Sequence, residues 1–239
     1  MRRQHDGANV SAPELVLIAH GTRSARGVEM IAALAEAVSQ RVPSVRVAFV
    51  DVLGPSPSEV LRALGGDAVA VPAFLASGYH VHTDVPREVA GFDGVAVTRA
   101  MGPDPALARV MHRRLREAGW QPGDAVVLAA AGSSDQRALA DVRRAAAMLA
   151  DRVGRRVEIG YVATGEPRVA DVVHRLRAAG EKRVFVASYL LAHGLFHERL
   201  STAGADGVAA PIGVHPDVVA LLVDRYHAGV RQLERVRAG

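Results

Sequence analysis

Two histidines and one aspartate stand close to the ends of predicted strands in the first half of this chain. His20 comes directly after the apolar run 15–19, and Asp51 and His80 follow the next two such runs. Parallel strands bring their carboxyl ends to one edge of a sheet, so we expect these side chains to converge there. Two imidazoles and a carboxylate suit a divalent first-row metal such as Fe, Co, Ni or Zn. They equally suit a proton-accepting pair, because the unperturbed pKa of histidine is about 6.5.

The segments around these residues alternate between strand and helix patterns. Apolar residues recur at helical spacing across 28–38, Pro43 stops that pattern, and 45–51 reads as the next strand. The first half predicts the order β-α-β-α-β-loop-β-α, with the loop at 76–86 and a helix at 103–119 that closes the unit. This order is typical of a parallel sheet covered by helices.

The second half of the chain repeats the first at a nearly constant offset. Residues 126–134 align with 15–23 at an offset of 111, and Pro167 aligns with Pro55 at an offset of 112. An offset held over several segments indicates a duplication. We therefore expect an α/β protein with two tandem parallel-sheet domains, flanked by helices and separated by a cleft, at residues 14–119 and 124–228.

The two repeats differ in their polar residues. Ala131 stands where the first repeat has His20, and Ala163 stands where it has Asp51. Because the strand recurs without the histidine, His20 is better explained by function than by folding. We expect the first domain to carry the chemistry and the second, degenerate repeat to shape the other wall of the cleft.

Composition excludes several classes of protein. The 239 residues include no cysteine, which excludes disulfides and thiolate metal sites. No apolar stretch approaches the roughly 18–20 residues of a transmembrane helix. The polar segment 1–13 lacks the apolar core of a secretory signal and is expected to be a frayed leader. We expect a cytoplasmic protein without membrane contact.

The chain is basic, with a formal net charge of +4 and Lys182 as its one lysine. The arginine excess is compatible with a GC-rich genome, or with a surface for a polyanion, because guanidinium groups pair with carboxylates and phosphates. Aromatic residues make up 4% of the chain, and long basic runs and recognition motifs are missing from the sequence. We therefore expect no nucleic acid partner.

Several further polar residues have two interpretations. His82 either joins the preceding histidine as a metal ligand or points away from it, and we expect the second. Asp84 is expected to cap the helix that follows it. His193 and His197 are four residues apart and would face each other on a helix. The other histidines are expected at ordinary surface positions: His5, His112, His174, His215 and His227.

Taken in order, these motifs resemble the CbiX/SirB family of sirohydrochlorin chelatases, within the class II chelatase group. The first half carries Ala-His-Gly-Thr-Arg at 19–23, Gly-Tyr-His at 78–80 and Asp-Val-Pro at 84–86. The second half carries Ala-Ser-Tyr-Leu-Leu-Ala at 187–192 and Gly-Leu-Phe-His-Glu-Arg at 194–199, which resemble the two-domain members. The resemblance covers almost the whole chain.

The resemblance implies a lyase of the metal chelatase type, which inserts Fe²⁺ or Co²⁺ into sirohydrochlorin for sirohaem or cobalamin synthesis, with Ni²⁺ as a further metal. The family's two histidines correspond to His20 and His80, which we expect to bind the metal and to accept pyrrole protons. Asp51 is one methylene shorter than the glutamate often found at its position in the family. The metal is the substrate, and no organic cofactor is expected.

Substrate contacts are expected from Arg23, Tyr79, Ser133 and His197, since sirohydrochlorin is a polycarboxylate and arginine pairs with carboxylates. Arg23 is equally explained as a solvated charge at a helix start, and Ser133 is better explained as an N-cap. The duplication is compatible with a monomer. Two alternatives stay open: a non-catalytic tetrapyrrole or metal carrier of the same fold, and a histidine phosphatase, which Ala19 disfavours because phosphatases have arginine there.

Overall fold

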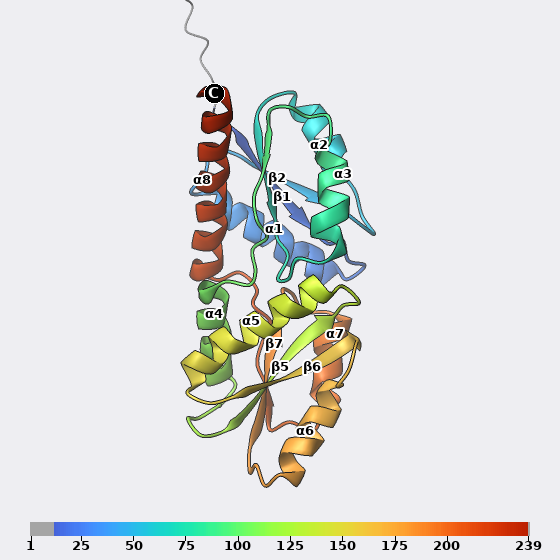
Figure 1. Cartoon of the computed structure of the whole chain (residues 1–239), viewed down its shortest axis with the longest axis vertical. Coiled ribbons are helices and arrows are strands. Elements are labelled where there is room, and N and C mark those ends of the chain that lie inside the picture. The colour runs from blue at the N-terminus through green and yellow to red at the C-terminus, as the bar shows by residue number, and fades with distance from the viewer. Residues whose placement is uncertain (1–11, 239) are drawn as a thin grey trace, which may run out of the picture.

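The structure, a computed structural model, describes residues 12–238, with one parallel sheet above another along the longest axis (Figure 1). Most of the leader predicted at 1–13, together with His5, lies outside the described residues. Within residues 12–238, no helix has both the length and the apolar composition needed to cross a membrane.

The first sheet has four parallel strands in the order β2-β1-β3-β4. Its central strands, β1 (Glu14–Ala19) and β3 (Ala68–Pro72), are almost entirely buried, which explains why their sequences are apolar without alternation. The edge strands are β2 (Val45–Phe49) and β4 (Val95–Val97). The helices of this half are α1 (Ala25–Ser39), α2 (Pro57–Leu64) and α3 (Val85–Val89).

Local signals in the sequence set the bounds of these helices. Ser56 and Glu59 form a reciprocal capping box at the start of α2, and Gly65 ends that helix with a φ of 61°. Leu34 and Val38 are buried along one face of α1, at the spacing that the sequence predicts.

The second sheet repeats the topology of the first, with the order β6-β5-β7-β8. Equivalent hydrogen bonds recur: the Phe49 N–H donates to the Pro55 carbonyl and the Tyr161 N–H donates to the Pro167 carbonyl, both at 2.9 Å. The predicted α/β fold with tandem parallel sheets is thereby confirmed. The elements of this half are β5 (Ala125–Gly132), α5 (Gln136–Val153), β6 (Val157–Thr164), α6 (Val169–Ala178), β7 (Val184–Tyr189), α7 (Leu195–Glu198) and β8 (Gly207–Val208).

The last helix of each repeat packs on the sheet of the other repeat. Helix α4 (Pro105–Glu117) contacts α5 and β7, whereas α8 (Pro216–Ala238) contacts α1, β3 and β4. Figure 1 shows α8 beside the first sheet and α4 beside the second. The expectation that the helix at 103–119 closes the first unit is therefore wrong. The boundaries 14–119 and 124–228 stay a prediction about the sequence repeats.

Two residues of α8 explain why it packs on the first sheet. A Cβ at Gly229 would overlap the side chain of Val69, so glycine allows α8 to approach β3 closely. Arg225 is 6% exposed, and its guanidinium donates to the Asp104 carboxylate at 2.9 Å and to the Met101 carbonyl at 3.4 Å. A buried charge with several hydrogen bonds fixes the segment where the chain crosses to the second half.

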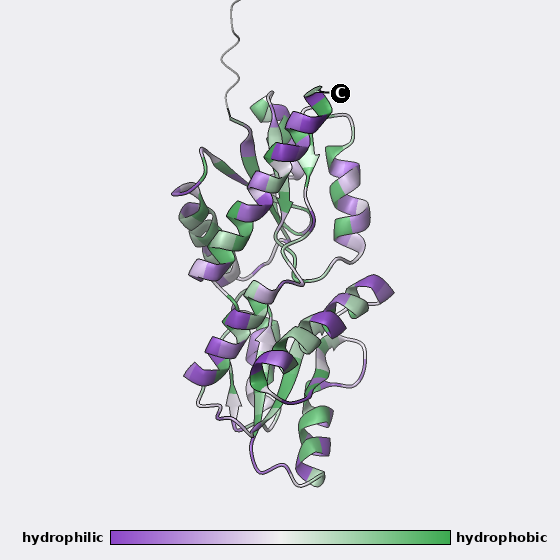
Figure 2. Ribbon diagram, turned by 60° about the vertical axis from the view of Figure 1, so that its left-hand side comes forward, coloured by the Kyte–Doolittle hydropathy of each residue, from purple (hydrophilic) through white to green (hydrophobic). Residues whose placement is uncertain are grey.

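The hydrophobic core is shared by both halves. One buried cluster includes Leu17 and Val71 of the first sheet, Met111 of α4 and Leu128 of the second sheet. Figure 2 shows hydrophobic residues along the strands of both sheets and hydrophilic residues interspersed along the helices. Because the core is continuous, the two sheets form one folded body.

Candidate active site

His20 stands at the carboxyl edge of the first sheet, directly after the buried strand β1. Its Nδ1 atom lies 2.7 Å from the Gly21 carbonyl oxygen. A carbonyl oxygen only accepts hydrogen bonds, so Nδ1 carries the proton and Nε2 keeps a free lone pair. A Cβ at Gly21 would overlap the backbone oxygen of Asp51, which means that glycine permits the two loops to meet.

Asp51 lies in the turn after β2, beside His20. Its Oδ2 atom is 3.8 Å from His20 Nε2, and its Oδ1 atom accepts a hydrogen bond of 2.7 Å from the Val52 N–H. Val52 has a φ of 67°, a left-handed conformation that is unusual for a β-branched residue. Such strained positions concentrate at functional sites, where surrounding contacts hold them. The strained turn directs the carboxylate of Asp51 towards His20.

His80 opens a π-helical turn, His80–Asp84, that continues into α3. Its Nδ1 atom lies 2.7 Å from Oδ2 of Asp84, whose side chain is 9% exposed. An ionised carboxylate only accepts, so Nδ1 carries the proton and Nε2 is again free to bind a metal. The expected loop at 76–86 is thus partly helical, and the expected N-cap role of Asp84 is wrong, because its side chain makes no capping hydrogen bond.

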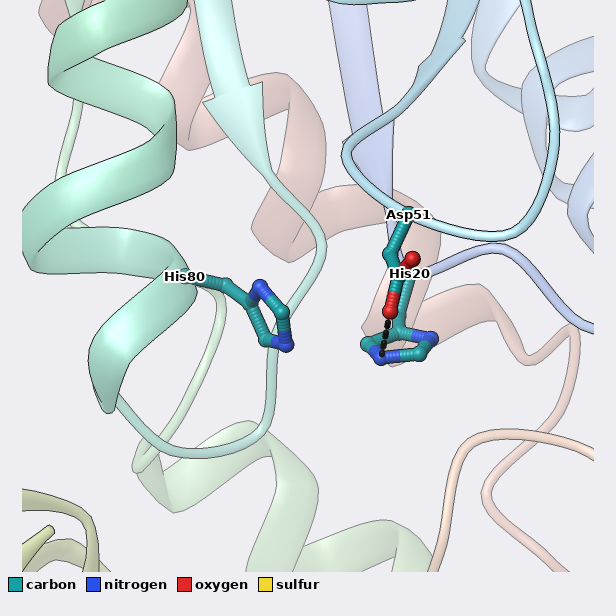
Figure 3. A group of neighbouring side chains, drawn as sticks. All are labelled: His20, Asp51 and His80. Carbon is teal, nitrogen blue, oxygen red and sulfur yellow. Dashed lines mark ion pairs between the residues drawn. The ribbon is translucent and has the colours of Figure 1, made fainter.

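The three side chains form one cluster, which we call the triad: His20, Asp51 and His80. One ligand atom from each lies within 4.8 Å of those of the other two. The two imidazole rings meet edge to face, with centroids 4.8 Å apart and an interplanar angle of 84°. Figure 3 shows the triad converging from three separate segments, with His20 and Asp51 on loops and His80 on a helical turn. Two imidazole nitrogens and a carboxylate, with one side exposed, can hold a divalent ion while leaving coordination positions open.

His82 does not belong to the triad. It is exposed and lines a separate hollow with Ser77, Arg99 and Arg137. The expectation that His82 points away from the histidine two residues before it is confirmed.

A cleft lies between the two halves of the molecule, at the carboxyl ends of both sheets. It consists of two adjoining cavities of about 400 and 460 Å³, which share lining residues from both halves. The hydroxyl of Tyr189 donates to the Leu75 carbonyl at 2.6 Å and links the two sheets beside the cleft. The shared lining is mostly apolar: His20, Phe74, Leu75, Leu190, Leu191 and Phe196.

Three of the four expected substrate residues line this cleft. Tyr79 and Ser133 line the larger cavity, together with His80, and His197 lines the smaller one. Ser133 Oγ accepts a hydrogen bond from the Asp135 N–H at 3.0 Å, in a turn before the helix. The expected N-cap role of Ser133 is wrong, because Asp135 caps α5 and accepts from the Arg137 N–H. Arg23 is exposed and lines neither cavity. Contact of these four residues with a substrate stays a prediction.

Sequence reasoning missed the aromatic and aliphatic lining of the cleft and gave little weight to His193. Phe196 stands at the repeat position of His80, so the comparison of the two repeats contained a signal for it. His193 lines the smaller cavity, with its ring centroid 4.7 Å from that of His197. His215 was expected at the surface, but it is 7% exposed, and its Nδ1 accepts from the Asp217 N–H at the start of α8.

The CbiX family profile matches the chain twice, over residues 14–118 and 125–228. This chain belongs to the CbiX family. The resemblance noted in the sequence is therefore confirmed, including the two-domain form. The expected enzyme class, a lyase-type metal chelatase, is confirmed at the level of the family.

Curated relatives of this family member carry chelatase names. The sirohydrochlorin ferrochelatase of Priestia megaterium is 25% identical over 231 residues, covering 87% of each chain. The sirohydrochlorin cobaltochelatase of Methanosarcina barkeri is 27% identical over 123 residues, covering 44% of this chain and 95% of that protein. The shorter relative thus corresponds in length to one repeat.

Solved structures share the fold of this CbiX-family chain. SirB from Bacillus subtilis with Fe³⁺ has a TM-score of 0.78 and 22% identity, covering 93% of this chain and 97% of that one. SirB from Bacillus subtilis subspecies spizizenii in complex with cobalt has a TM-score of 0.73 and 20% identity, with the same coverage. Both relatives extend over nearly the whole chain, so the two-domain architecture is common to all three.

Proposed function

We propose that this protein inserts Fe²⁺ or Co²⁺ into sirohydrochlorin, with Ni²⁺ as a further metal accepted in the assay. The single observation that carries the proposal is the triad: the two free imidazole Nε2 atoms belong to residues that line an apolar cleft, and the carboxylate of Asp51 lies beside them. Family membership and the names of the curated relatives support the same activity.

The triad holds the metal as a substrate rather than as a resident cofactor. Nε2 of His20, Nε2 of His80 and one carboxylate oxygen of Asp51 bind one side of the ion and leave the other side open to the macrocycle. The hydrogen bonds at both Nδ1 atoms fix the tautomers and orient the rings. Once the ion has moved into the ring, the two Nε2 atoms are free to take protons.

The cleft supplies the binding surface for the macrocycle. Phe74 and Phe196 come from opposite halves of the molecule and would pack on the apolar faces of a flat tetrapyrrole. The carboxylates of sirohydrochlorin would then lie towards the rim, where Tyr79 is exposed, and Arg23 and Arg26 stand exposed at the start of α1. Because one chain provides both walls, we infer a monomer as the working unit, which size-exclusion chromatography would test.

The decisive experiment is a metal insertion assay under anaerobic conditions. Sirohydrochlorin is mixed with Fe²⁺, Co²⁺ or Ni²⁺, with and without protein, and the absorbance change is followed. We expect the protein to accelerate insertion, and we expect His20→Ala and His80→Ala each to lower kcat by at least about 100-fold. His174→Ala, an exposed histidine of α6, is the matched control and is expected to keep full activity.

Two outcomes would contradict the proposal in different ways. Tight binding of sirohydrochlorin and metal without faster insertion would identify a carrier of the same fold instead of an enzyme. Full activity of both triad variants, with an active wild type, would leave the reaction intact and refute the assignment of the site.

A further inference from the structure

A second pair of histidines lies in the cleft, on the wall that the other half of the molecule provides. His193 follows β7 and His197 lies in α7, and both line the cavity of about 400 Å³ that His20 lines from the first half. Their ring centroids are 4.7 Å apart with an interplanar angle of 75°. His80 lines the adjoining cavity, which shares His20 with this one. A flat molecule in this cavity would have His20 at one side and the pair at the other.

The hydrogen bonds and surroundings of the pair make both imidazoles proton acceptors. Nε2 of His197 lies 3.1 Å from the Ala209 carbonyl oxygen, which only accepts, so Nε2 carries the proton and Nδ1 is free. Burial, the neighbouring ring of His197 and the positive charges of Arg26 and Arg114 hold the pKa of His193 below its usual value of 6.5. The lowered pKa favours the neutral form of His193, in which one ring nitrogen keeps a free lone pair.

The pair is poorly suited to hold a metal ion by itself. Among the residues that the structure describes, the one group of three metal-ligating side chains is the triad, so neither a carboxylate nor a third histidine completes a site around His193 and His197. Two ligands with nearby arginine charges bind a cation weakly.

The triad leaves one chemical requirement unmet. While the metal is bound, Nε2 of His20 and Nε2 of His80 are occupied, and both Nδ1 atoms already carry protons that they donate. Insertion of a divalent ion into the macrocycle releases two pyrrole protons. The first proton must leave while the ion still contacts the triad, so it needs an acceptor elsewhere in the cleft.

We propose that His193 and His197 accept the first pyrrole proton on the face of the macrocycle opposite the metal. The step rests on the proposed chelatase function. One pyrrole N–H bond breaks, its electron pair stays on the nitrogen and becomes a bond to the ion, and the proton moves to Nδ1 of His197 or to a ring nitrogen of His193. The second proton goes to a triad histidine after the ion has left it, and both protons then pass to solvent.

The test compares variants of the pair with the wild-type full-length protein. In His197→Gln, the amide Nε2 keeps the hydrogen-bond donor to Ala209 but provides no base, and His193→Gln removes the other imidazole. The double variant is expected to lower kcat for Co²⁺ insertion by about 100-fold, with the KM for Co²⁺ and the affinity for Co²⁺ alone unchanged within twofold. His174→Gln, on the outer helix α6, is the matched control.

Two further readouts separate proton transfer from a merely structural contribution. Added imidazole is expected to restore part of the rate of the double variant, in proportion to its free-base form, because a small base can enter the vacated space. Circular dichroism and thermal unfolding check the fold, and each single variant is measured in case the double variant does not fold.

The outcomes that would overturn the inference are distinct from a failure of the proposed function. An inactive wild type removes the proposed function and this step with it. With an active wild type, an unchanged kcat in the double variant refutes the step alone. A loss of affinity for Co²⁺ alone would show that the pair holds the metal, and a raised KM for sirohydrochlorin with unchanged kcat would show a binding contact without proton transfer.

Discussion

Replacing Asp84 by asparagine tests how the metal-binding geometry of His80 is fixed. The Asp84 side chain is 9% exposed and accepts from His80 Nδ1 at 2.7 Å, a short, charge-assisted hydrogen bond. Hydrogen bonds to charged groups contribute about 1.5–3 kcal/mol and neutral ones about 0.5–1.5 kcal/mol. Replacing the charge-assisted hydrogen bond by a neutral one therefore removes about 1–1.5 kcal/mol of stabilisation from the His80 ring. If this stabilisation is lost from the metal-bound state, metal binding becomes about tenfold weaker.

A second effect adds to this loss. The amide NH₂ of asparagine can donate to Nδ1 of His80, and the ring proton would then sit on Nε2, the atom that must bind the metal. We therefore expect Asp84→Asn to weaken Co²⁺ binding by at least about tenfold, and Asp84→Ala to weaken it by about 10–100-fold. Titration with Co²⁺ alone, followed by its visible absorption or by calorimetry, measures the triad without the tetrapyrrole.

Arg87 provides the matched control for this experiment. Its guanidinium lies 3.1 Å from the other oxygen of Asp84, and its side chain is 65% exposed. Exposed ion pairs contribute about 0–1 kcal/mol, so Arg87→Gln is expected to change Co²⁺ affinity by less than about fivefold. Wild-type affinity in Asp84→Asn, or an equal loss in Arg87→Gln, would refute the view that the carboxylate sets the tautomer of His80.

Three other substitutions test how the fold supports the site. Gly21→Ala places a Cβ against the backbone oxygen of Asp51, so we expect about 1–3 kcal/mol lower stability in denaturant unfolding and weaker Co²⁺ binding. Gly229→Ala is expected to lower the melting temperature, because the Cβ overlaps Val69 of β3 under α8. Gly66→Ala, whose Cβ would meet the Leu64 carbonyl oxygen at an ordinary 3.9 Å, is the control for both and should change little. Burial lowers the pKa of His215, so the folded state binds fewer protons than the unfolded state. The free energy of unfolding therefore decreases as pH falls below 6.5, the pKa of this histidine in the unfolded chain. His215→Asn keeps an acceptor for the helix start without titrating, and its melting temperature should fall less than that of the wild type between about pH 7.5 and pH 5.5; equal falls would contradict this.

The convergence of the triad could be predicted because it follows from strand direction. Once 15–19 and the next two apolar runs are read as parallel strands, their carboxyl ends must share one edge, and the residues after them must be neighbours. The duplication showed Ala131 at the repeat position of His20. Because the second strand forms without a histidine there, His20 is explained by function and not by folding. The sequence alone therefore located the metal-binding candidates and the fold class.

The role of Asp84 could not be predicted, because it depends on where a helix begins. Asp-Val-Pro is a typical helix start, and a cap was the reasonable expectation. The helical turn instead begins at His80, which places Asp84 four residues into it and directly beneath the imidazole. His193 was undervalued for a related reason, since its repeat partner Ser77 gave no sign of a second cleft-lining imidazole.

The packing of α4 on the second sheet and of α8 on the first sheet could not be predicted from the sequence either. Apolar spacing tells which face of a helix is buried, but it does not tell which of two similar sheets covers that face. Leu107 and Met111 are buried on one face of α4, and this helix packs beside α5 and β7 of the other repeat.

This packing of α4 and α8 makes the two repeats inseparable as folding units. A fragment cut between them would keep α4 without the sheet it covers, and a sheet without α8, so each half would expose core surface that only its counterpart can bury. Separately produced halves should accordingly fold only when mixed. The same interlock means that the spacing between the triad and the opposite wall is set as the chain folds, and that widening it would require breaking a continuous core rather than bending a linker.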